Sequence, residues 1–222
     1  MPDSGAVAIL VPVLRRPHRV APLLASIEAA TPQPHRVVFI VSPDDTAERD
    51  AVRAAGADML TLDHPPCGGD YARKINAAYR LISEPLLFLG ADDLHFHPGW
   101  LPAATALLDQ AHVIGTNDLG NPRVLRGEHA THSLVTRAYA DEHGTIDEPR
   151  KILHEGYQHE YVDDELVGTA KHRGVWAFAA DSVVEHLHPH WAKAPTDDLY
   201  EAQATRLRAS RPLFNRRRRL WT

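Results

Sequence analysis

The first ninety residues alternate between short apolar runs and segments with helical periodicity. Apolar runs that predict buried strands cover residues 6–13, 37–41, 59–62 and 86–89. Between them, apolar residues recur at helical spacing in Val20, Leu23, Leu24 and Ile27, and again over 70–82. Strands separated by helical segments of about a dozen residues imply right-handed crossovers. The pattern predicts a mainly parallel sheet with helices on both faces.

Capping and turn residues indicate where some of these elements begin and end. Asp45 is followed three residues later by Glu48, which predicts a capping box at a helix start, and Gly56 is placed to end that helix. The run Pro65-Pro66-Cys67-Gly68-Gly69 predicts a loop.

The second half of the chain has a less regular pattern. It predicts helices over 101–110, 163–171 and 197–209, and strands over 113–116, 132–136, 176–179 and 183–187, with a polar loop over 117–129. The sequence contains no internal repeat, and 222 residues suit one domain. We therefore predict one α/β domain over residues 1–195, followed by a C-terminal helix and basic tail over 196–222.

The composition is that of an ordinary globular enzyme, with 44% hydrophobic and 24% charged residues. No apolar run approaches the roughly 20 residues of a membrane span, and no secretory signal surrounds residues 6–13. We expect a cytoplasmic protein without a transmembrane segment. Cys67 is the sole cysteine of the sequence, which excludes a disulfide framework and a cysteine-based zinc module.

The net charge of −5, with histidine neutral, argues against a globally basic nucleic-acid binder. The run Arg216–Arg219 is a local exception. Two readings of this run stay open: a solvated tail, or a patch that docks an acceptor or a membrane surface.

Two adjacent carboxylates, Asp92 and Asp93, follow the apolar run of residues 86–89. A buried strand that ends in acids brings negative charge to the rim of a sheet, where Mg²⁺ or Mn²⁺ is held against a phosphate. Such a pair is also common in a simple turn that caps a helix. The turn residues Pro98-Gly99 downstream favour a rigid setting for the pair.

Two common nucleotide-binding devices are absent from the sequence. The residues after the first strand, Pro12-Val13-Leu14-Arg15-Arg16-Pro17, contain neither a G-x-G-x-x-G fingerprint nor a phosphate loop. This argues against a dehydrogenase and an ATPase. A parallel sheet still binds nucleotides beyond its strand ends, where cations or a metal neutralise the diphosphate.

A second acidic cluster, Asp163-Asp164-Glu165, opens a predicted helix. The helix dipole alone favours acids there. A functional interpretation makes one carboxylate the general base that removes a proton from an attacking hydroxyl, with Asp164 as first candidate and Asp163 as second.

A histidine cluster follows the apolar residues Val183 and Val184. Alternation along an extended chain places His186 and His188 on one face, where an imidazole would complete a carboxylate metal site. A surface run of histidines is the alternative.

Taken in order, these segments resemble family 2-like glycosyltransferases of the GT-A fold over about residues 6–188. The residues that carry the resemblance are Pro12, Ser42–Asp45, Gly69–Asn76, Leu87–Asp93, Pro98–Leu101, Val162–Leu166, Gly174–Phe178 and Asp181–His186. The resemblance implies a GT-A (Rossmann-like) fold and a metal-dependent, inverting transfer of a sugar from a nucleotide-diphosphate donor, most commonly a UDP-sugar.

The resemblance also implies roles for individual residues. Asp44 or Asp45 would contact the base and ribose, and Arg73 or Lys74 would lie near the diphosphate. Asp92 and His186 would hold Mn²⁺ or Mg²⁺ with Asp93 nearby, and Asp164 would be the base of a single-displacement transfer.

The sequence departs from the family pattern at two places. Gly90 stands where the family commonly has the first acid of its Asp-x-Asp motif, so Asp92 supplies the second acid alone. After Pro12, polar residues are replaced by Val13-Leu14 and then Arg15-Arg16, arginines that would suit a direct contact with the diphosphate.

Other function classes remain open at this point. Acids with histidines would equally suit a metal-dependent phosphohydrolase or nucleotidyltransferase, and the arginine run would suit a non-catalytic sugar or nucleic-acid binding module. A lipid, a glycan, a protein or a hydroxylated DNA base could each be the acceptor. The basic run favours a polyanionic one, such as modified DNA.

Overall fold

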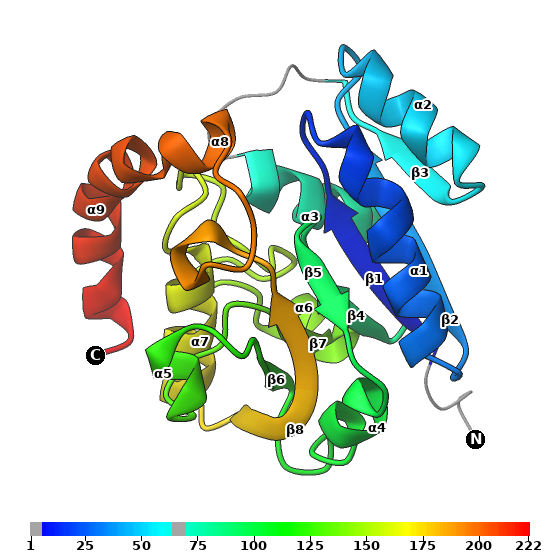
Figure 1. The fold of residues 1–222 in the computed structure, drawn as a ribbon. Helices are drawn as coiled ribbons and strands as arrows, with labels where there is room; N and C mark the ends of the chain where they lie inside the picture. The colour runs from blue at the N-terminus through cyan, green and yellow to red at the C-terminus, as the bar shows by residue number, and fades with distance from the viewer. Residues whose placement is uncertain (1–5, 64–69) are drawn as a thin grey trace.

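The chain forms a twisted sheet flanked by helices in this computed structural model, which describes residues 6–63 and 70–222 (Figure 1). The strands are β1 (Val7–Pro12), β2 (His35–Val41), β3 (Asp58–Thr61), β4 (Leu86–Leu89), β5 (Leu94–Phe96), β6 (Val113–Asn117), β7 (Ser133–Thr136) and β8 (Trp176–His186). Among the described residues their order across the sheet is β3-β2-β1-β4-β7-β6-β8-β5. The predicted loop at 65–69 lies outside the described residues.

Most neighbouring strands run parallel. β1 pairs in parallel with β2 and β4, β2 with β3, and β6 with β8. β7 is antiparallel to β4 and β6, and β5 is antiparallel to β8. The predicted α/β class with a mixed, mainly parallel sheet is confirmed. Because Leu10 of β1 lies opposite Leu89 of β4, the residues after both strands emerge at one edge of the sheet.

Helices bury both faces of the sheet. The first face packs against α1 (Val20–Ala30), α2 (Thr46–Ala54) and α4 (Trp100–Thr105), and the second against α3 (Asp70–Leu81), α6 (Arg137–Glu142) and α7 (Val162–His172). Within β1, Val7, Ile9 and Val11 belong to the first core, whereas Ala8 and Leu10 belong to the second. Burial on both faces explains why this strand is apolar at consecutive positions rather than alternating.

The predicted start and end of α2 are confirmed, but the capping box is half formed, because the Glu48 carboxylate accepts from the Arg16 N–H and not from the Asp45 N–H. The Asp45 carboxylate accepts a hydrogen bond from the Glu48 backbone N–H at 3.3 Å, which satisfies a free donor of the first turn. Gly56 follows the helix with a φ of +67°, a left-handed conformation that glycine adopts without steric cost.

The second half differs from its predicted pattern. β8 is one strand where two were predicted, because a shift in its pairing with β6 absorbs residues 180–182. α4 ends at Thr105 rather than at 110, since Leu107 and Leu108 bond to carbonyls three residues back instead of four. The short elements β5, α5 (Pro122–Leu125) and α6 were not predicted, because three to six residues carry too little periodicity.

The C-terminal helix is longer than predicted and takes in part of the arginine run. α8 (Asp198–Glu201) leads into α9 (Gln203–Arg217), which lies beside α7 (Figure 1). Arg217 is buried, and its Nη2 lies 2.7 Å from Glu165 Oε1 and 2.6 Å from Asp147 Oδ1. This residue therefore fits neither a solvated tail nor a docking patch, because it anchors α9 to the domain.

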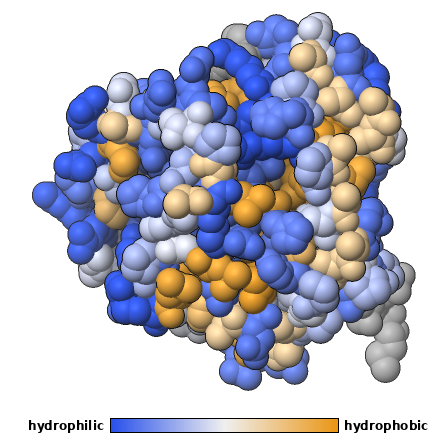
Figure 2. Space-filling view, in the orientation of Figure 1, coloured by the Kyte–Doolittle hydropathy of each residue, from blue (hydrophilic) through white to orange (hydrophobic). Residues whose placement is uncertain are grey.

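The face seen in Figure 2 is largely hydrophilic, with hydrophobic side chains gathered in its lower part. Among the described residues, no helix combines the length and the apolar character that crossing a membrane requires.

Replacing Arg217 should destabilise the protein. Arg217→Gln leaves the buried Glu165 carboxylate without its cation, so we expect a loss of about 3–5 kcal/mol in the free energy of unfolding. The neighbouring exposed Arg216 gives the control, and Arg216→Gln should change the value by less than about 0.5 kcal/mol. Urea unfolding measures both. Equal effects of the two substitutions would contradict the anchoring role of Arg217.

Candidate active site

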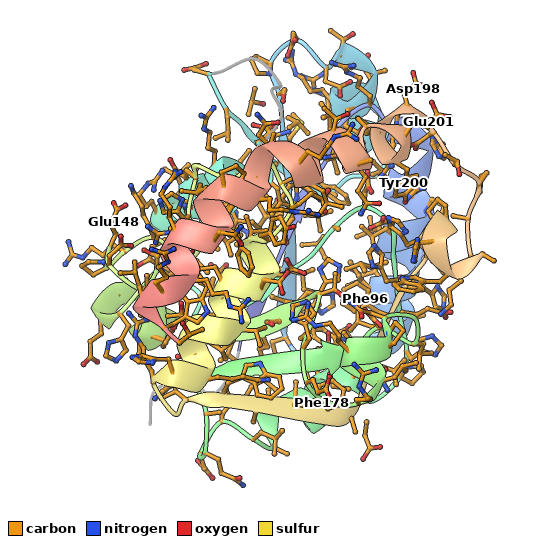
Figure 3. The ribbon with its side chains drawn as sticks, turned by 90° about the vertical axis from the view of Figure 1, so that its left-hand side faces the viewer. Phe96, Glu148, Phe178, Asp198, Tyr200 and Glu201 are labelled. Carbon is orange, nitrogen blue, oxygen red and sulfur yellow. The ribbon has the colours of Figure 1, made fainter. Side chains whose placement is uncertain are left out.

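A cavity of about 670 Å³ opens where the chain leaves β1 and β4. Its wall combines the residues after these strands with the start of α7, the end of β8 and helix α8. Figure 3 labels Tyr200, which α8 contributes to this wall. Segments far apart in the sequence therefore meet at one edge of the sheet, the position at which open α/β sheets bind ligands.

Asp92 and Asp93 form the acidic floor of the cavity. The Gly90 N–H donates to the Leu10 carbonyl at 2.8 Å, which continues the pairing of β4 with β1 up to the acids. Both carboxylates are buried, with 9% exposure for Asp92 and 7% for Asp93. Two adjacent buried carboxylates repel each other and lose hydration, so their ionisation requires nearby cations.

Two arginines supply positive charge beside Asp92. Arg16 Nη1 lies 3.1 Å from Asp92 Oδ1, and Arg19 Nη1 lies 3.6 Å from the same atom and 3.6 Å from Asp93 Oδ2. Burial and the adjacent charge of Asp93 nevertheless raise the pKa of Asp92 above its ordinary value. The full negative charge on Asp92 is thus only partly compensated, and an additional cation would stabilise it.

Asp93 is held by a histidine and a tyrosine. His186 Nε2 lies 3.2 Å from Asp93 Oδ2, and the Tyr200 hydroxyl donates to the same oxygen at 2.7 Å. Burial by itself would raise the pKa of Asp93, but His186 and Tyr200 hold it below its ordinary value. Burial opposes protonation of His186, yet the charge of Asp93 raises the pKa of this histidine. Asp93 and His186 therefore behave as an ion pair.

Helix α8 closes one side of the cavity through contacts with Arg16. Asp197, which caps α8, accepts hydrogen bonds from Arg16 Nε at 2.7 Å and Nη2 at 2.8 Å. The Tyr200 ring stacks against the same guanidinium, 4.1 Å from ring centre to Cζ. Arg16 is therefore shared between the acid pair and the C-terminal segment.

A second polar cluster lies at the start of α7. His129 Nε2 is 3.1 Å from Asp163 Oδ2, and Arg123 Nη1 is 2.8 Å from Asp164 Oδ1. Burial, followed by the charge of Asp163, raises the pKa of Asp164. Burial opposes ionisation of Asp163 as well, but the hydrogen bond from His129 lowers its pKa. Of the two acids, Asp164 is thus the stronger base.

No protein-family model matches this sequence. No curated protein matches it either. Similar solved structures do exist. A mannosyltransferase from Pyrobaculum calidifontis, in complex with GDP-Man and Mn²⁺, matches with a TM-score of 0.70 and 16% identity over 98% of this chain and 69% of its own. Glucosyl-3-phosphoglycerate synthase from Mycobacterium tuberculosis matches with a TM-score of 0.63 and 14% identity over 96% of this chain and 80% of its own, in a complex with Mn²⁺, UDP-glucose and phosphoglyceric acid.

The chain has the GT-A fold of glycosyltransferases. The match extends over nearly the whole chain, so it confirms the fold predicted from the ordered series of motifs. At this level of identity the likeness concerns the fold.

The GT-A cavity gathers most of the predicted site residues. Those on its wall are Pro12, Arg15, Lys74, Asp92, Asp93, Asp163, Asp164, His186 and His188. Lys74 is buried, and its ammonium group donates to the Val13 carbonyl at 2.7 Å and pairs with Asp70 at 2.5 Å. Its contacts fix the chain after β1.

Other predicted residues lie off the cavity wall. Asp44 and Arg73 are exposed, and Asp45 caps α2 while accepting a hydrogen bond from the Arg15 backbone N–H at 2.7 Å. The sequence interpretation missed Arg19, His129, His132 and Tyr200, all of which lie on the cavity wall or contact the acid pair. In the sequence, the one local sign of positive charge beside the acid pair is the group of basic residues after the first strand, Arg15, Arg16 and Arg19.

Two groups of residues in the cavity carry side chains of the kinds that bind a divalent cation. Asp92, Asp93 and His186 provide carboxylate oxygens and an imidazole, ligands that Mn²⁺ accepts. In addition, one trio among the described residues, His129, Asp163 and Asp164, has ligand atoms that all lie within 4.8 Å of one another. A further imidazole nitrogen, Nε2 of His132, is buried among the described residues without a hydrogen-bond partner, on the same wall as the acid pair.

A side chain at Gly90 would have little room. A Cβ atom built at Gly90 would lie 3.0 Å from the Leu10 carbonyl oxygen and 3.6 Å from Val11 Cγ2. The closer of these two atoms belongs to the backbone of the central strand β1, and the packed strand can shift only slightly to make room.

We therefore expect Gly90→Ala to lower the free energy of unfolding by about 1–3 kcal/mol, the usual cost of overpacking a core. Gly90→Asp should cost at least as much, because it adds a third carboxylate to the buried pair. Chemical denaturation of the two variants checks both values. An unchanged unfolding midpoint for Gly90→Ala would show that β1 accommodates the methyl group.

Proposed function

We propose that this chain is a metal-dependent glycosyltransferase that moves a sugar from a nucleotide-diphosphate donor to a hydroxyl acceptor. The observation that carries the proposal is the buried pair Asp92–Asp93 at the edge of a GT-A sheet, flanked by Arg16, Arg19 and His186 inside a cavity of about 670 Å³. A pair of acids with a histidine suits a cation, and the adjacent guanidinium groups suit a diphosphate.

The donor would lie across the acid pair. Arg16 and Arg19 both lie beside the carboxylate of Asp92. A guanidinium group binds a phosphate through the same kind of hydrogen bonds as it binds a carboxylate. Asp92, Asp93 and His186 would hold Mn²⁺ or Mg²⁺, which when bound neutralises the charge that develops on the departing diphosphate. The donor could carry uridine or guanosine, as the donors of the two similar structures do.

Asp164 would be the general base of an inverting transfer. It lies on the cavity wall at the start of α7, and burial raises its pKa, which makes it a better proton acceptor near neutral pH. Asp163 would be a positioning residue, because the hydrogen bond from His129 lowers the pKa of its carboxyl, whereas the pKa of Asp164 is raised despite its contact with Arg123. An acceptor hydroxyl placed beside Asp164 would attack the anomeric carbon on the face opposite the nucleotide.

The first test is donor binding. UDP- and GDP-sugars should stabilise the protein in thermal-shift experiments with Mn²⁺ by about 3 kcal/mol at a hundredfold excess over Kd, which for this chain length is a rise of several degrees in Tm. Asp92→Asn should remove the metal-dependent part, whereas Asp181→Asn, an exposed acid on β8, should not. Absence of a metal-dependent shift with every nucleotide sugar would refute the proposal.

The second test concerns the base. Asp164→Asn should leave donor-induced stabilisation unchanged but slow the release of nucleotide diphosphate from the donor by about 10²–10⁴-fold, because proton removal is lost. Asp181→Asn is again the matched control. Release of inorganic phosphate instead of nucleotide diphosphate would favour a phosphohydrolase, and full activity of Asp164→Asn would exclude this residue as the base.

A further inference from the structure

Two buried imidazole nitrogens on the cavity wall have no hydrogen-bond partner among the described residues, His129 Nδ1 and His132 Nε2. His132 is 5% exposed, and its Nδ1 lies 2.9 Å from the Leu89 carbonyl oxygen. A carbonyl accepts and does not donate, so Nδ1 must carry the proton and Nε2 must present a lone pair. Buried polar atoms are nearly always bonded, so the free Nε2 on the cavity wall indicates that a ligand completes it.

We propose that His132 Nε2 is a second imidazole ligand for a transition-metal ion held by Asp93 and His186. This inference rests on the proposed function, because it assigns one more ligand to the cation of that site. It also predicts which metals the site prefers.

The spacing of the two imidazoles supports a shared ion. The His132 and His186 ring centres are 5.3 Å apart, with the rings at 85° to each other. Two imidazoles bound to one ion through Nε2, with metal–nitrogen distances of about 2.1 Å and roughly tetrahedral angles, have ring centres about 5 Å apart. The two rings are therefore already at the separation that a common ion imposes.

The surroundings of His132 are those of a metal ligand. A hydrogen bond from the distal nitrogen to a backbone carbonyl is the usual way in which a metal-binding histidine is oriented. The strand β7, which begins at Ser133, fixes the backbone next to it.

The nearby carboxylate of Asp118 already has its own hydrogen-bond donors. Asp118 lies close enough to affect both histidines, but its Oδ2 accepts from the Thr131 hydroxyl and its Oδ1 from the Gly120 and Asn121 N–H groups. The carboxylate of Asp118 is therefore occupied by hydrogen bonds within its own loop.

The ligand atoms of Asp93, His132 and His186 are not all within 4.8 Å of one another, so the ion would draw them together by side-chain rotation. His186, the more exposed of the two histidines, would turn from its present contact with Asp93 Oδ2 toward the ion.

A site with two imidazoles should discriminate between cations. Mg²⁺ prefers oxygen ligands, whereas Mn²⁺ and Co²⁺ accept imidazole. We therefore expect the full-length protein to bind Mn²⁺ and Co²⁺ more tightly than Mg²⁺ in the absence of any nucleotide. His132→Gln should reduce this preference by weakening Mn²⁺ binding at least about tenfold.

Counting the imidazole nitrogens on bound Mn²⁺ by pulsed electron paramagnetic resonance tests the inference directly. The unsubstituted protein should show two such nitrogens, and His132→Gln and His186→Gln should each show one. His129→Gln should still show two, which separates this site from the His129–Asp163–Asp164 trio. His112→Gln, an exposed histidine bonded to Thr136, is the control for the substitution itself.

The experiment distinguishes a failure of the proposed metal ligand from a failure of the proposed function. One imidazole nitrogen in the unsubstituted protein, or no Mn²⁺ binding, would overturn the inference. This measurement uses the unsubstituted protein, so it does not depend on whether a variant folds. Loss of nucleotide-sugar binding in His132→Gln with unchanged Mn²⁺ affinity would also overturn it, because Nε2 would then bond to the donor. Two nitrogens together with no nucleotide-sugar binding would support the metal site and refute the glycosyltransferase.

Discussion

The burial of two adjacent carboxylates at the end of β4 is the constraint on which the rest of the site depends. Asp92 and Asp93 lose most of their hydration, so the chain must bring cations and donors to them. Arg16 and Arg19 come from the exit of β1, His186 from the end of β8, and Tyr200 from α8. These contacts link the residues after β1, the end of β8 and helix α8 to the acid pair at the end of β4.

The C-terminal segment is held to the domain by the same kind of interaction at its two ends. Asp197 meets Arg16 beside the acid pair, and Arg217 meets Glu165 on α7. Each contact gives a buried charged group a partner of opposite charge. This explains why an arginine run that resembles a tail in the sequence contains a buried anchor. Residues of α8 and of the first half of α9 also line the cavity.

Sequence patterns predicted the parts of the molecule that local order determines. The buried strands β1, β2 and β4, the capped helix α2 and the acids at the strand end follow from runs, caps and the order of motifs. β5 and the continuous β8 depend on pairing with strands elsewhere in the chain, which a local pattern does not contain. His132 and Tyr200 were missed for the same reason: the bond from Tyr200 to Asp93 spans 107 residues.

The contacts that stabilise the acid pair also determine what binding a donor would require. A diphosphate that takes the guanidinium of Arg16 competes with Asp92 and Asp197, and a cation at Asp93 competes with the Tyr200 hydroxyl. In each exchange, the contact that is lost is replaced by a contact with a charged group at the same position. A cation alone would compensate part of the charge of the acid pair, and a diphosphate bound beside it would add negative charge that strengthens the binding of the cation. On the proposed function, the buried acid pair therefore makes the cation and the donor strengthen each other's binding.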